Sequence, residues 1–356
     1  MVNSQHAQHR QKSKTIFKPY FTDAFDDPRD LDKAAYQAIT TKINSEDSDV
    51  SSDETAERVP DITKLAATGG RHAQRLFSSA LLRSDYHRLL NDDSVPYDTR
   101  RRVCQAAEEG ALKFQHAAPT DDERALSDPA YLCSWRHGYG LDQPELYPGT
   151  RCAKTCAECG PACSINQAKF ASGNHVLSCG HTGLRLRRHN GLARTVVAPF
   201  LQAMGWTWDE TEIQTSIDSQ ERVDALCRNS SLSVNPLAVD VTIGVPANHD
   251  GGAAVTNPHH TTKALEKGKE SKHGSKCAAL GYDFLPAAFT SFGGWGEAIM
   301  KVLQKEYHAK KKQEKKSGGS GWLTQRWKQD LLERASISIA KGNYNMLRDN
   351  RTLPAG

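Results

Sequence analysis

The sequence has no apolar run long enough to cross a membrane, and it has few aromatic side chains. A membrane-spanning helix needs roughly 20 consecutive apolar residues, and neither such a run nor an N-terminal segment resembling a signal peptide is present. Only 38% of the residues are hydrophobic and 7% are aromatic, which limits the chain to one or two modest cores. We therefore expect an intracellular protein with no membrane partner and with long disordered parts.

The sequence also lacks a strong excess of either positive or negative charge. Its cysteines are odd in number, so they cannot all pair in disulfides within the chain. Its 46 basic and 42 acidic residues leave a formal net charge of +4, so any affinity for nucleic acid has to come from local basic patches. Inside a reducing cell, these 9 cysteines would be thiols or metal ligands. Where the cysteines cluster is therefore more informative than how many there are.

The stretch Leu237–Val245 carries the clearest structural pattern. Its apolar residues alternate so strictly that a strand is predicted, with Asp240 on the face opposite its neighbours. The other predicted elements are a helix over 192–204 kinked at Pro199 and ended by Gly205, a helix over 262–280 closed by Gly281, a strand over 283–290, a helix over 295–307 and a last helix from Trp322. This alternation of helices and strands predicts a mixed α/β core.

Cysteines and histidines gather between residues 152 and 189. Cys156 and Cys159 are separated by two residues, and His175 and Cys179 by three, spacings at which two short turns each present two ligands to one tetrahedral zinc ion. Further candidate ligands are Cys152, Cys163, His181 and His189. A loop of free cysteines with surface histidines is the alternative. Four protein ligands leave no open position, so such a zinc ion would be structural.

Two isolated aspartates are candidates for a second metal site. Asp224 stands in Arg-Val-Asp-Ala-Leu, upstream of Asp240, and Glu212 is a candidate third carboxylate, with Glu210 a weaker one. Hard cations such as magnesium bind carboxylates that converge from neighbouring strands, and such cations assist phosphodiester hydrolysis. The alternative for Asp240 is an edge-strand aspartate that faces water.

A lysine usually joins such carboxylates to stabilise developing negative charge. Thr242 occupies the position where the simplest Asp-x-Lys motif would place that lysine, so the lysine has to come from elsewhere in the chain. Lys269, Lys272 and Lys276 have the three- and four-residue spacing of one helix face. That spacing is equally normal on a solvated helix face, which is the alternative interpretation.

Taken in order along the chain, these motifs resemble one known family. The residues that carry the resemblance are Cys156-x-x-Cys159, His175-x-x-x-Cys179, Arg188-His189-Asn190, Arg222-Val223-Asp224, Ala238-Val239-Asp240-Val241-Thr242, Lys269-x-x-Lys272-His273, Gly281-Tyr282-Asp283-Phe284-Leu285-Pro286 and Phe292-Gly293-Gly294-Trp295. The chain resembles, over roughly Ala111 to Leu347, the C-terminal region of non-LTR retrotransposon polyproteins. That region joins a CCHC zinc knuckle to a restriction-like endonuclease of the PD-(D/E)xK superfamily.

The resemblance implies both a fold and a function. The expected fold is a restriction-endonuclease-like mixed sheet flanked by helices, preceded by a small zinc knuckle and a helical lead-in. Asp224 and Asp240 would bind the catalytic magnesium or manganese, and the Lys269/Lys272 pair would supply the displaced lysine. The implied activity is nicking of chromosomal, double-stranded DNA in the nucleus, so that a reverse transcriptase primes on the exposed end. Element RNA and a separate reverse transcriptase are the other implied partners.

On this basis the chain divides into six predicted segments. They are a disordered arm (1–62), a helical lead-in (63–150), the zinc knuckle (151–190), the endonuclease core (191–308), a charged linker (309–321) and a C-terminal helix with its tail (322–356).

The sequence departs from the family pattern in three places. Val223 replaces the usual proline or alanine before the first aspartate, and His273 replaces the usual tyrosine after Lys272. No polymerase motif is present, because the pair Asp92-Asp93 lacks the flanking pattern of a polymerase palm. The chain therefore resembles a separated tail of such an element, lacking the reverse transcriptase domain.

Two other functions compete with hydrolysis. One is a catalytically inactive nucleic-acid-binding remnant, in which the knuckle and the basic segments Arg185–Arg188 and Lys310–Lys316 grip phosphates. The run Lys310–Lys316 is also typical of a solvated linker or a nuclear-import signal. The other is catalysis at the zinc, as in a deaminase, which is set aside because no His-x-Glu precedes the Cys156/Cys159 pair in the arrangement required.

Overall fold

The computed structural model describes residues 86–115, 117–122, 124–143, 173–178, 183–209, 213–214, 222–229, 235–246 and 255–349. The chain forms two compact units, residues 1–91 and 92–356, and every element named below belongs to the second. The predicted arm (1–62), the first part of the lead-in and most of the predicted zinc knuckle lie outside the described residues.

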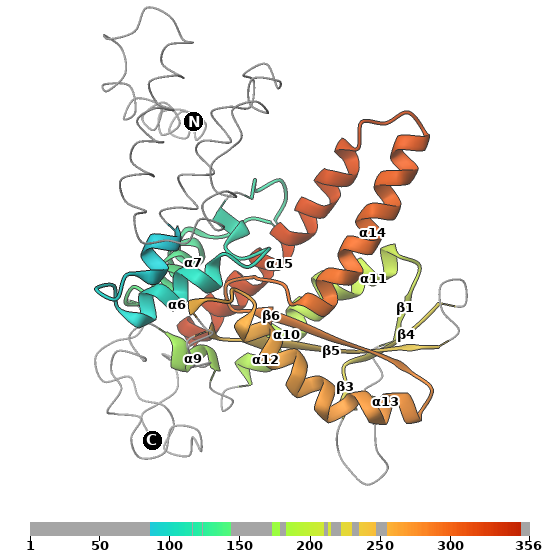
Figure 1. The fold of residues 1–356 in the computed structure, drawn as a ribbon, viewed down its shortest axis with the longest axis horizontal. Helices are drawn as coiled ribbons and strands as arrows, with labels where there is room; N and C mark the ends of the chain where they lie inside the picture. The colour runs from blue at the N-terminus through green and yellow to red at the C-terminus, as the bar shows by residue number, and fades with distance from the viewer. Residues whose placement is uncertain are drawn as a thin grey trace, which may run out of the picture. The chain divides into compact units, whose positions relative to one another are not determined.

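A four-stranded mixed sheet forms the centre of the second unit (Figure 1). Its strands, in spatial order, are β1 (Thr207–Asp209), β4 (Ala225–Arg228), β5 (Leu237–Gly244) and β6 (Asp283–Thr290). The pairs β1/β4 and β4/β5 are antiparallel, and the pair β5/β6 is parallel. A separate pair is formed by β2 (Ile213–Gln214) and β3 (Arg222–Val223). Helices flank the sheet, and the predicted mixed α/β core is confirmed.

The parallel pair is joined by a helical crossover on one face of the sheet. It consists of α12 (His260–Lys269), a π-helical segment η6 (Glu270–Gly274) and α13 (Ser275–Ala279). The predicted helix over 262–280 is thus confirmed, with a wider turn in its middle. It ends where Gly281 adopts a φ of +73°, a left-handed conformation that glycine reaches without steric cost.

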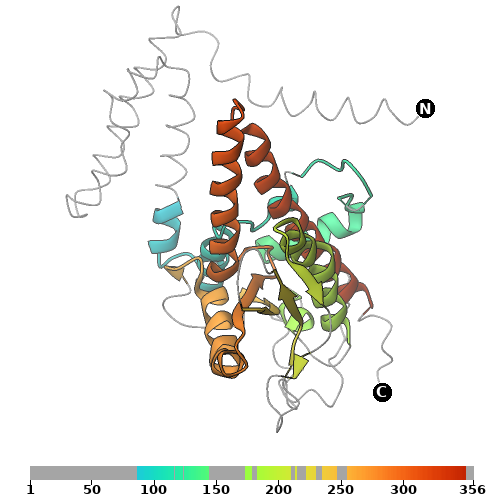
Figure 2. The same cartoon turned by 90° about the vertical axis from the view of Figure 1, so that its right-hand side faces the viewer.

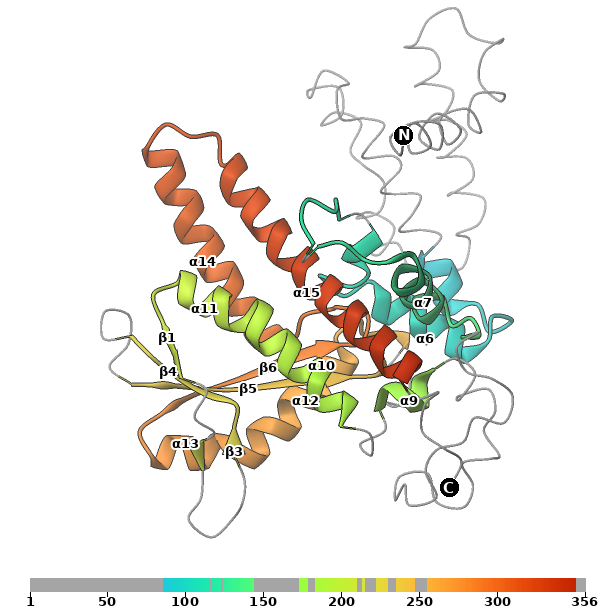
Figure 3. The ribbon, with the colours of Figure 1, turned by 180° about the vertical axis from the view of Figure 1, so that it is seen from behind.

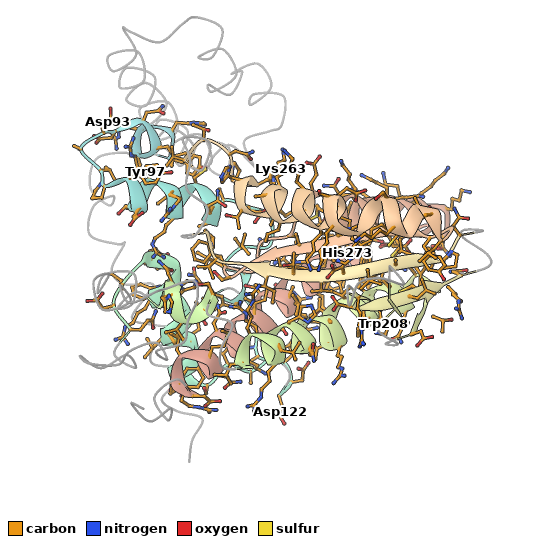
Figure 4. All side chains as sticks on the ribbon, turned by 90° about the horizontal axis from the view of Figure 1, so that it is seen from below. Asp93, Tyr97, Asp122, Trp208, Lys263 and His273 are labelled. Atoms are coloured by element: carbon orange, nitrogen blue, oxygen red, sulfur yellow. The ribbon has the colours of Figure 1, made fainter. Side chains whose placement is uncertain are left out.

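The opposite face is covered by a second broken helix. Its parts are α10 (Leu184–Leu192), the π-helical segment η3 (Ala193–Val197) and α11 (Ala198–Ala203). Proline lacks an N–H and clashes with the carbonyl four residues earlier, so the wide π turn directly before Pro199 gives the predicted kink a physical basis. Figure 4 shows the sheet lying between the two broken helices.

Strand β5 is buried along both faces, from Ala238 to Gly244. The predicted strand is confirmed, and β5 is an interior strand of the sheet with helices on both sides. Val239 and Val241 pack with Leu192, Phe289 and Trp295 in the main hydrophobic cluster. Asp240 is therefore not at a sheet edge, and the alternative of an aspartate facing water is wrong.

Residues 297–349 form two long helices, α14 (Glu297–Lys316) and α15 (Trp322–Asp349), packed against each other (Figure 2). The predicted linker over 309–321 is mostly wrong, because α14 continues through Lys316. Its Lys, Glu and Gln residues are good helix formers, and an i,i+4 ion pair joins Lys310 to Glu306 across 3.2 Å. Charge density in this run reflects an exposed helix surface.

Within the second unit, the lead-in packs against the C-terminal helix through the 3-10 turn η1 (Lys113–Gln115) and α7 (Asp128–Tyr139). The lead-in also contains α6 (Tyr97–Ala106), and α9 (Asn174–Ser178) follows later. Phe114 is buried against Ile337 and Ala340 of α15, and its N–H donates to Ser336 Oγ at 3.1 Å. Residues 92–143 of the lead-in thus belong to the second unit and are not a separate domain. Among the described helices, none combines the length and the apolarity that crossing a bilayer requires.

Candidate metal and phosphodiester site

Asp240 occupies the middle of the sheet, on the face covered by the crossover helix. Its side chain is only 4% exposed. Lys269, in the last turn of α12, places its Nζ 2.9 Å from the carboxylate and donates a hydrogen bond to Oδ1. His273, four residues later in η6, is fully buried and has its Nε2 3.3 Å from Oδ2. Figure 4 labels His273 at the side of this helix that faces the sheet.

Asp224 lies at the junction of β3 and β4, next to β5. Its backbone N–H donates to the carbonyl of Val239 at 3.0 Å, and its Oδ2 accepts a hydrogen bond from the N–H of Val241 at 2.6 Å. The Asp224 carboxylate thus accepts a backbone hydrogen bond from β5, at Val241, one residue after Asp240. This fixes the side chain close to the centre of the sheet.

The carboxyl groups of Asp224 and Asp240 lie close enough for each to affect the ionisation of the other. Burial raises the pKa of Asp240 to about 6, opposed by Lys269 and reinforced by the charge of Asp224. Burial also favours the protonated form of Asp224, but its bond to His189 and the Val241 N–H outweigh that effect and lower its pKa. The two neighbouring carboxyl groups thus have different pKa values: Asp224 is ionised at neutral pH, whereas Asp240 takes up a proton at a pH only slightly below neutral.

His189 of α10 is the residue that holds Asp224 in place. Its Nε2 lies 3.0 Å from Asp224 Oδ2 and 2.8 Å from the carbonyl oxygen of Val241, so Nε2 carries a hydrogen to donate. Nδ1 lies 3.0 Å from Oδ1 of Asn190. Burial alone would lower the pKa of His189, but hydrogen bonding to Asp224 and its charge raise that pKa. The carboxylate of Asp224 therefore stabilises the protonated form of His189.

The position of His189 corrects one sequence-based interpretation. From the sequence, His189 is a further candidate zinc ligand. In the structure its Nε2 instead points at Asp224 and the carbonyl of Val241. His189 lies in the last turn of α10, within the broken helix that precedes the sheet, and this position separates it from the predicted knuckle ligands. His273 was seen only as a departure from a family pattern, and its burial beside Asp240 was not anticipated.

The two predicted lysines have different environments. Lys269 is half-buried against Asp240, whereas Lys272 is exposed and forms no hydrogen bond or ion pair with any described residue. The π-helical turn that begins at Glu270 widens the helix, so Lys269 and His273 share the face toward β5 and Lys272 does not. The pair therefore brings a single lysine to the carboxylates. Lys276 is half-buried in α13.

Several predicted ligands cannot be placed. Glu212, with Glu210, and the zinc candidates Cys156, Cys159 and Cys179 lie outside the described residues. His175, the fourth zinc candidate, is half-buried in the short helix α9. Within the described ranges, no three His, Cys, Asp or Glu side chains are grouped to hold a metal ion.

The donor chemistry around Asp240 nevertheless suits a hard divalent cation. Its Oδ2 is buried, with the ammonium of Lys269 at 2.9 Å and Nε2 of His273 at 3.3 Å, and a second carboxylate lies beside it. Magnesium prefers oxygen donors and is commonly bound through one or two carboxylates, with waters and substrate phosphates completing its coordination. Two aspartates are therefore a sufficient protein contribution.

A basic groove lies on the other side of α10. It has a volume of about 400 Å³ and is formed by α10, η3 and α15. Its charged lining side chains are Arg187, Arg188, Arg334, Lys341, Arg348 and Asp349. The groove residues of α10 face α15, whereas His189 faces β5, so one helix separates the groove from the carboxylates.

The sequence matches no protein-family model and no curated protein.

Proposed function

We propose that the chain is a metal-dependent DNA endonuclease with a restriction-like core, which nicks double-stranded target DNA for retrotransposon integration by target-primed reverse transcription. One observation carries the proposal: Asp224 and Asp240 come from neighbouring strands to a common place, and Lys269 reaches the same place from the crossover helix. A buried carboxylate beside a half-buried one raises the electrostatic energy of the fold, and such unfavourable clusters gather at functional sites.

Asp224 and Asp240 would hold a magnesium or manganese ion. When bound, this ion supplies activation of water and neutralisation of charge on the phosphate. The side chains of the chain itself have distinct tasks. Lys269 places a positive charge next to the carboxylates, where it stabilises negative charge on the phosphate oxygens and orients water. His189 fixes the orientation of Asp224 and keeps that group ionised.

The remaining parts of the proposal follow from the sequence resemblance. Cys156, Cys159, His175 and Cys179 would bind a structural zinc ion, and the protein would act in the nucleus with a separate reverse transcriptase and element RNA. Zinc analysis of the purified protein tests the knuckle: one zinc ion per chain is expected, and its loss in Cys156→Ser is the expected result. Full zinc content in Cys156→Ser would remove that cysteine from the ligand set.

Conversion of supercoiled plasmid to the nicked circle tests the activity. The parent protein in magnesium or manganese is expected to nick, and Asp240→Asn with intact zinc content is expected to be inactive. Lys272→Ala is the matched control, because it removes an exposed lysine from the same helix. Equal nicking by the parent and Asp240→Asn would overturn the proposal.

A non-catalytic nucleic-acid-binding protein is the second candidate. The basic groove favours it, because it offers several cations at a place that takes no part in hydrolysis. Tight, strongly salt-dependent DNA binding by a parent protein that cleaves nothing in either metal would select this candidate.

A further inference from the structure

The end of the α14/α15 hairpin projects away from the sheet (Figures 1 and 3). Two large apolar side chains at this end are exposed. Trp322 is 64% exposed and Leu323 is 67% exposed, at the first two positions of α15. Exposing adjacent large apolar residues at such a tip costs solubility, so their presence calls for a partner. Neither function proposed above uses them.

The tip is held in a defined shape. Oε2 of Glu314 accepts hydrogen bonds from the N–H of Thr324 at 2.9 Å and from its hydroxyl at 2.6 Å. Oε1 accepts one from the N–H of Leu323 at 3.3 Å. Glu314 of α14 thus caps the N-terminus of α15, satisfying N–H groups that would otherwise lack partners. Trp322 and Leu323 are therefore presented from a fixed turn.

Cations and aromatic rings hold the two helices together below the tip. The ammonium of Lys310 lies 5.2 Å from the ring centroid of Trp327, and that of Lys328 lies 5.5 Å from the ring of Tyr307. The hydroxyl of Tyr307 donates to Gln325 Oε1 at 2.8 Å. These contacts fix the hairpin without covering its outer surface.

The charge of the tip is strongly one-sided. Residues 309–328 contain seven basic residues and one acidic residue, Glu314, which serves as the helix cap. The exposed cations with no ion-pair partner in the described part of the chain are Lys312, Lys315, Lys316 and Arg326. A polyanion complements this surface.

We propose that the hairpin tip binds single-stranded nucleic acid, with the indole of Trp322 stacked on an unpaired base and the surrounding lysines on the flanking phosphates. An exposed aromatic ring amid cations is the combination that binds single strands, because every base offers a flat face and every linkage a negative charge. Leu323 extends the apolar platform beside the ring. A duplex keeps its bases stacked on one another, so the tip prefers unpaired strands.

Membrane insertion is the competing use of such a tip. Interfacial helices bury a continuous apolar face together with a basic one. Here the outward apolar surface is confined to two residues, while the lysines continue along α14. The pattern therefore fits a charged strand with separate bases better than a lipid surface.

Binding of a fluorescently labelled 20-nucleotide oligothymidine by the full-length protein tests the proposal. Trp322→Ala is expected to weaken binding by about tenfold, within the range measured for loss of one base–aromatic stack. Trp322→Phe, which keeps a stacking face, retains most of the affinity, and parent tryptophan fluorescence is quenched on binding. Trp135→Ala, which removes another partly exposed tryptophan, is the matched control and binds like the parent.

The outcomes separate this proposal from the others. Unchanged oligonucleotide binding in Trp322→Ala would overturn it, as would preferential binding of Trp322 to vesicles containing phosphatidylserine. A plasmid-nicking failure alongside intact, Trp322-dependent binding would defeat the proposed function and leave this inference standing.

Discussion

Lys269 donates a hydrogen bond to Asp240 across 2.9 Å although the two residues are 29 positions apart in the chain. The contact forms because the crossover helix packs along the sheet, so that Lys269, the last residue of α12, faces the interior strand β5. A lysine held in this way supplies a fixed charge at the place where two carboxylates meet.

The first prediction compares two lysines of one helix. Lys269→Ala is expected to reduce the nicking rate by at least about 100-fold, the usual cost of removing a charge-stabilising donor. Lys272→Ala, which removes a solvated side chain, is expected to change the rate less than about threefold. Rates under single-turnover conditions on a labelled duplex provide the measurement. Equal losses in both variants would mean that the lysines act only through general DNA affinity.

The second prediction concerns His189. Without its imidazole, Asp224 loses the partner that lowers its pKa, and burial then favours the protonated form. His189→Ala is expected to lower metal affinity and nicking by about 10- to 100-fold, as for other residues that orient metal ligands. The acidic limb of the pH–rate profile is expected to move to higher pH, and His189→Gln, which keeps an N–H donor, restores part of the activity.

Zinc content separates this role of His189 from the alternative one. His189→Ala is expected to keep the zinc content of the parent protein, because the imidazole is directed at Asp224. A parallel fall in zinc content would return His189 to the zinc ligand set.

The third prediction follows from the raised pKa of Asp240. The folded-state pKa of about 6 lies above the ordinary value of 3.8. Its protonated form therefore stabilises the fold fully below pH 3.8, and that stabilisation is lost as the pH rises through 6. Asn imitates the protonated carboxyl, so without divalent metal Asp240→Asn is expected to be more stable than the parent at pH 8, by on the order of 2 kcal/mol. Urea unfolding at pH 8 and pH 4.5 measures this, with the difference shrinking at the lower pH. A parent protein that is the more stable of the two at pH 8 would contradict the assignment.

The sequence predicts the elements around the site better than their environment. The strand of Asp240 follows from local alternation. Its burial depends on β4 and β6, which make it an interior strand, and on the helices that cover both faces of the sheet. The choice between Lys269 and Lys272 depends on a π-helical turn, a hydrogen-bond pattern that spacing does not reveal. His189 could not be assigned from sequence, because an imidazole beside cysteines suits zinc as well as it suits a carboxylate.

The extent of α14 shows the same limit. A lysine-rich run followed by Gly and Ser is typical of a linker, yet Lys, Glu and Gln are also good helix formers, and Glu314 ties the end of α14 to the start of α15. Composition alone does not tell these cases apart. The hydrogen bonds between Glu314 and the start of α15 distinguish a helix end from a linker at this position.

Binding of manganese to the metal-free protein is the most direct test of a shared cation at Asp224 and Asp240. Electron paramagnetic resonance of free Mn²⁺ during a titration gives the number of bound ions and their affinity. The parent protein is expected to bind manganese at a site that magnesium displaces, and both Asp224→Asn and Asp240→Asn are expected to weaken it by more than about tenfold. Manganese binding that is identical in the parent and in both variants would contradict the proposed site.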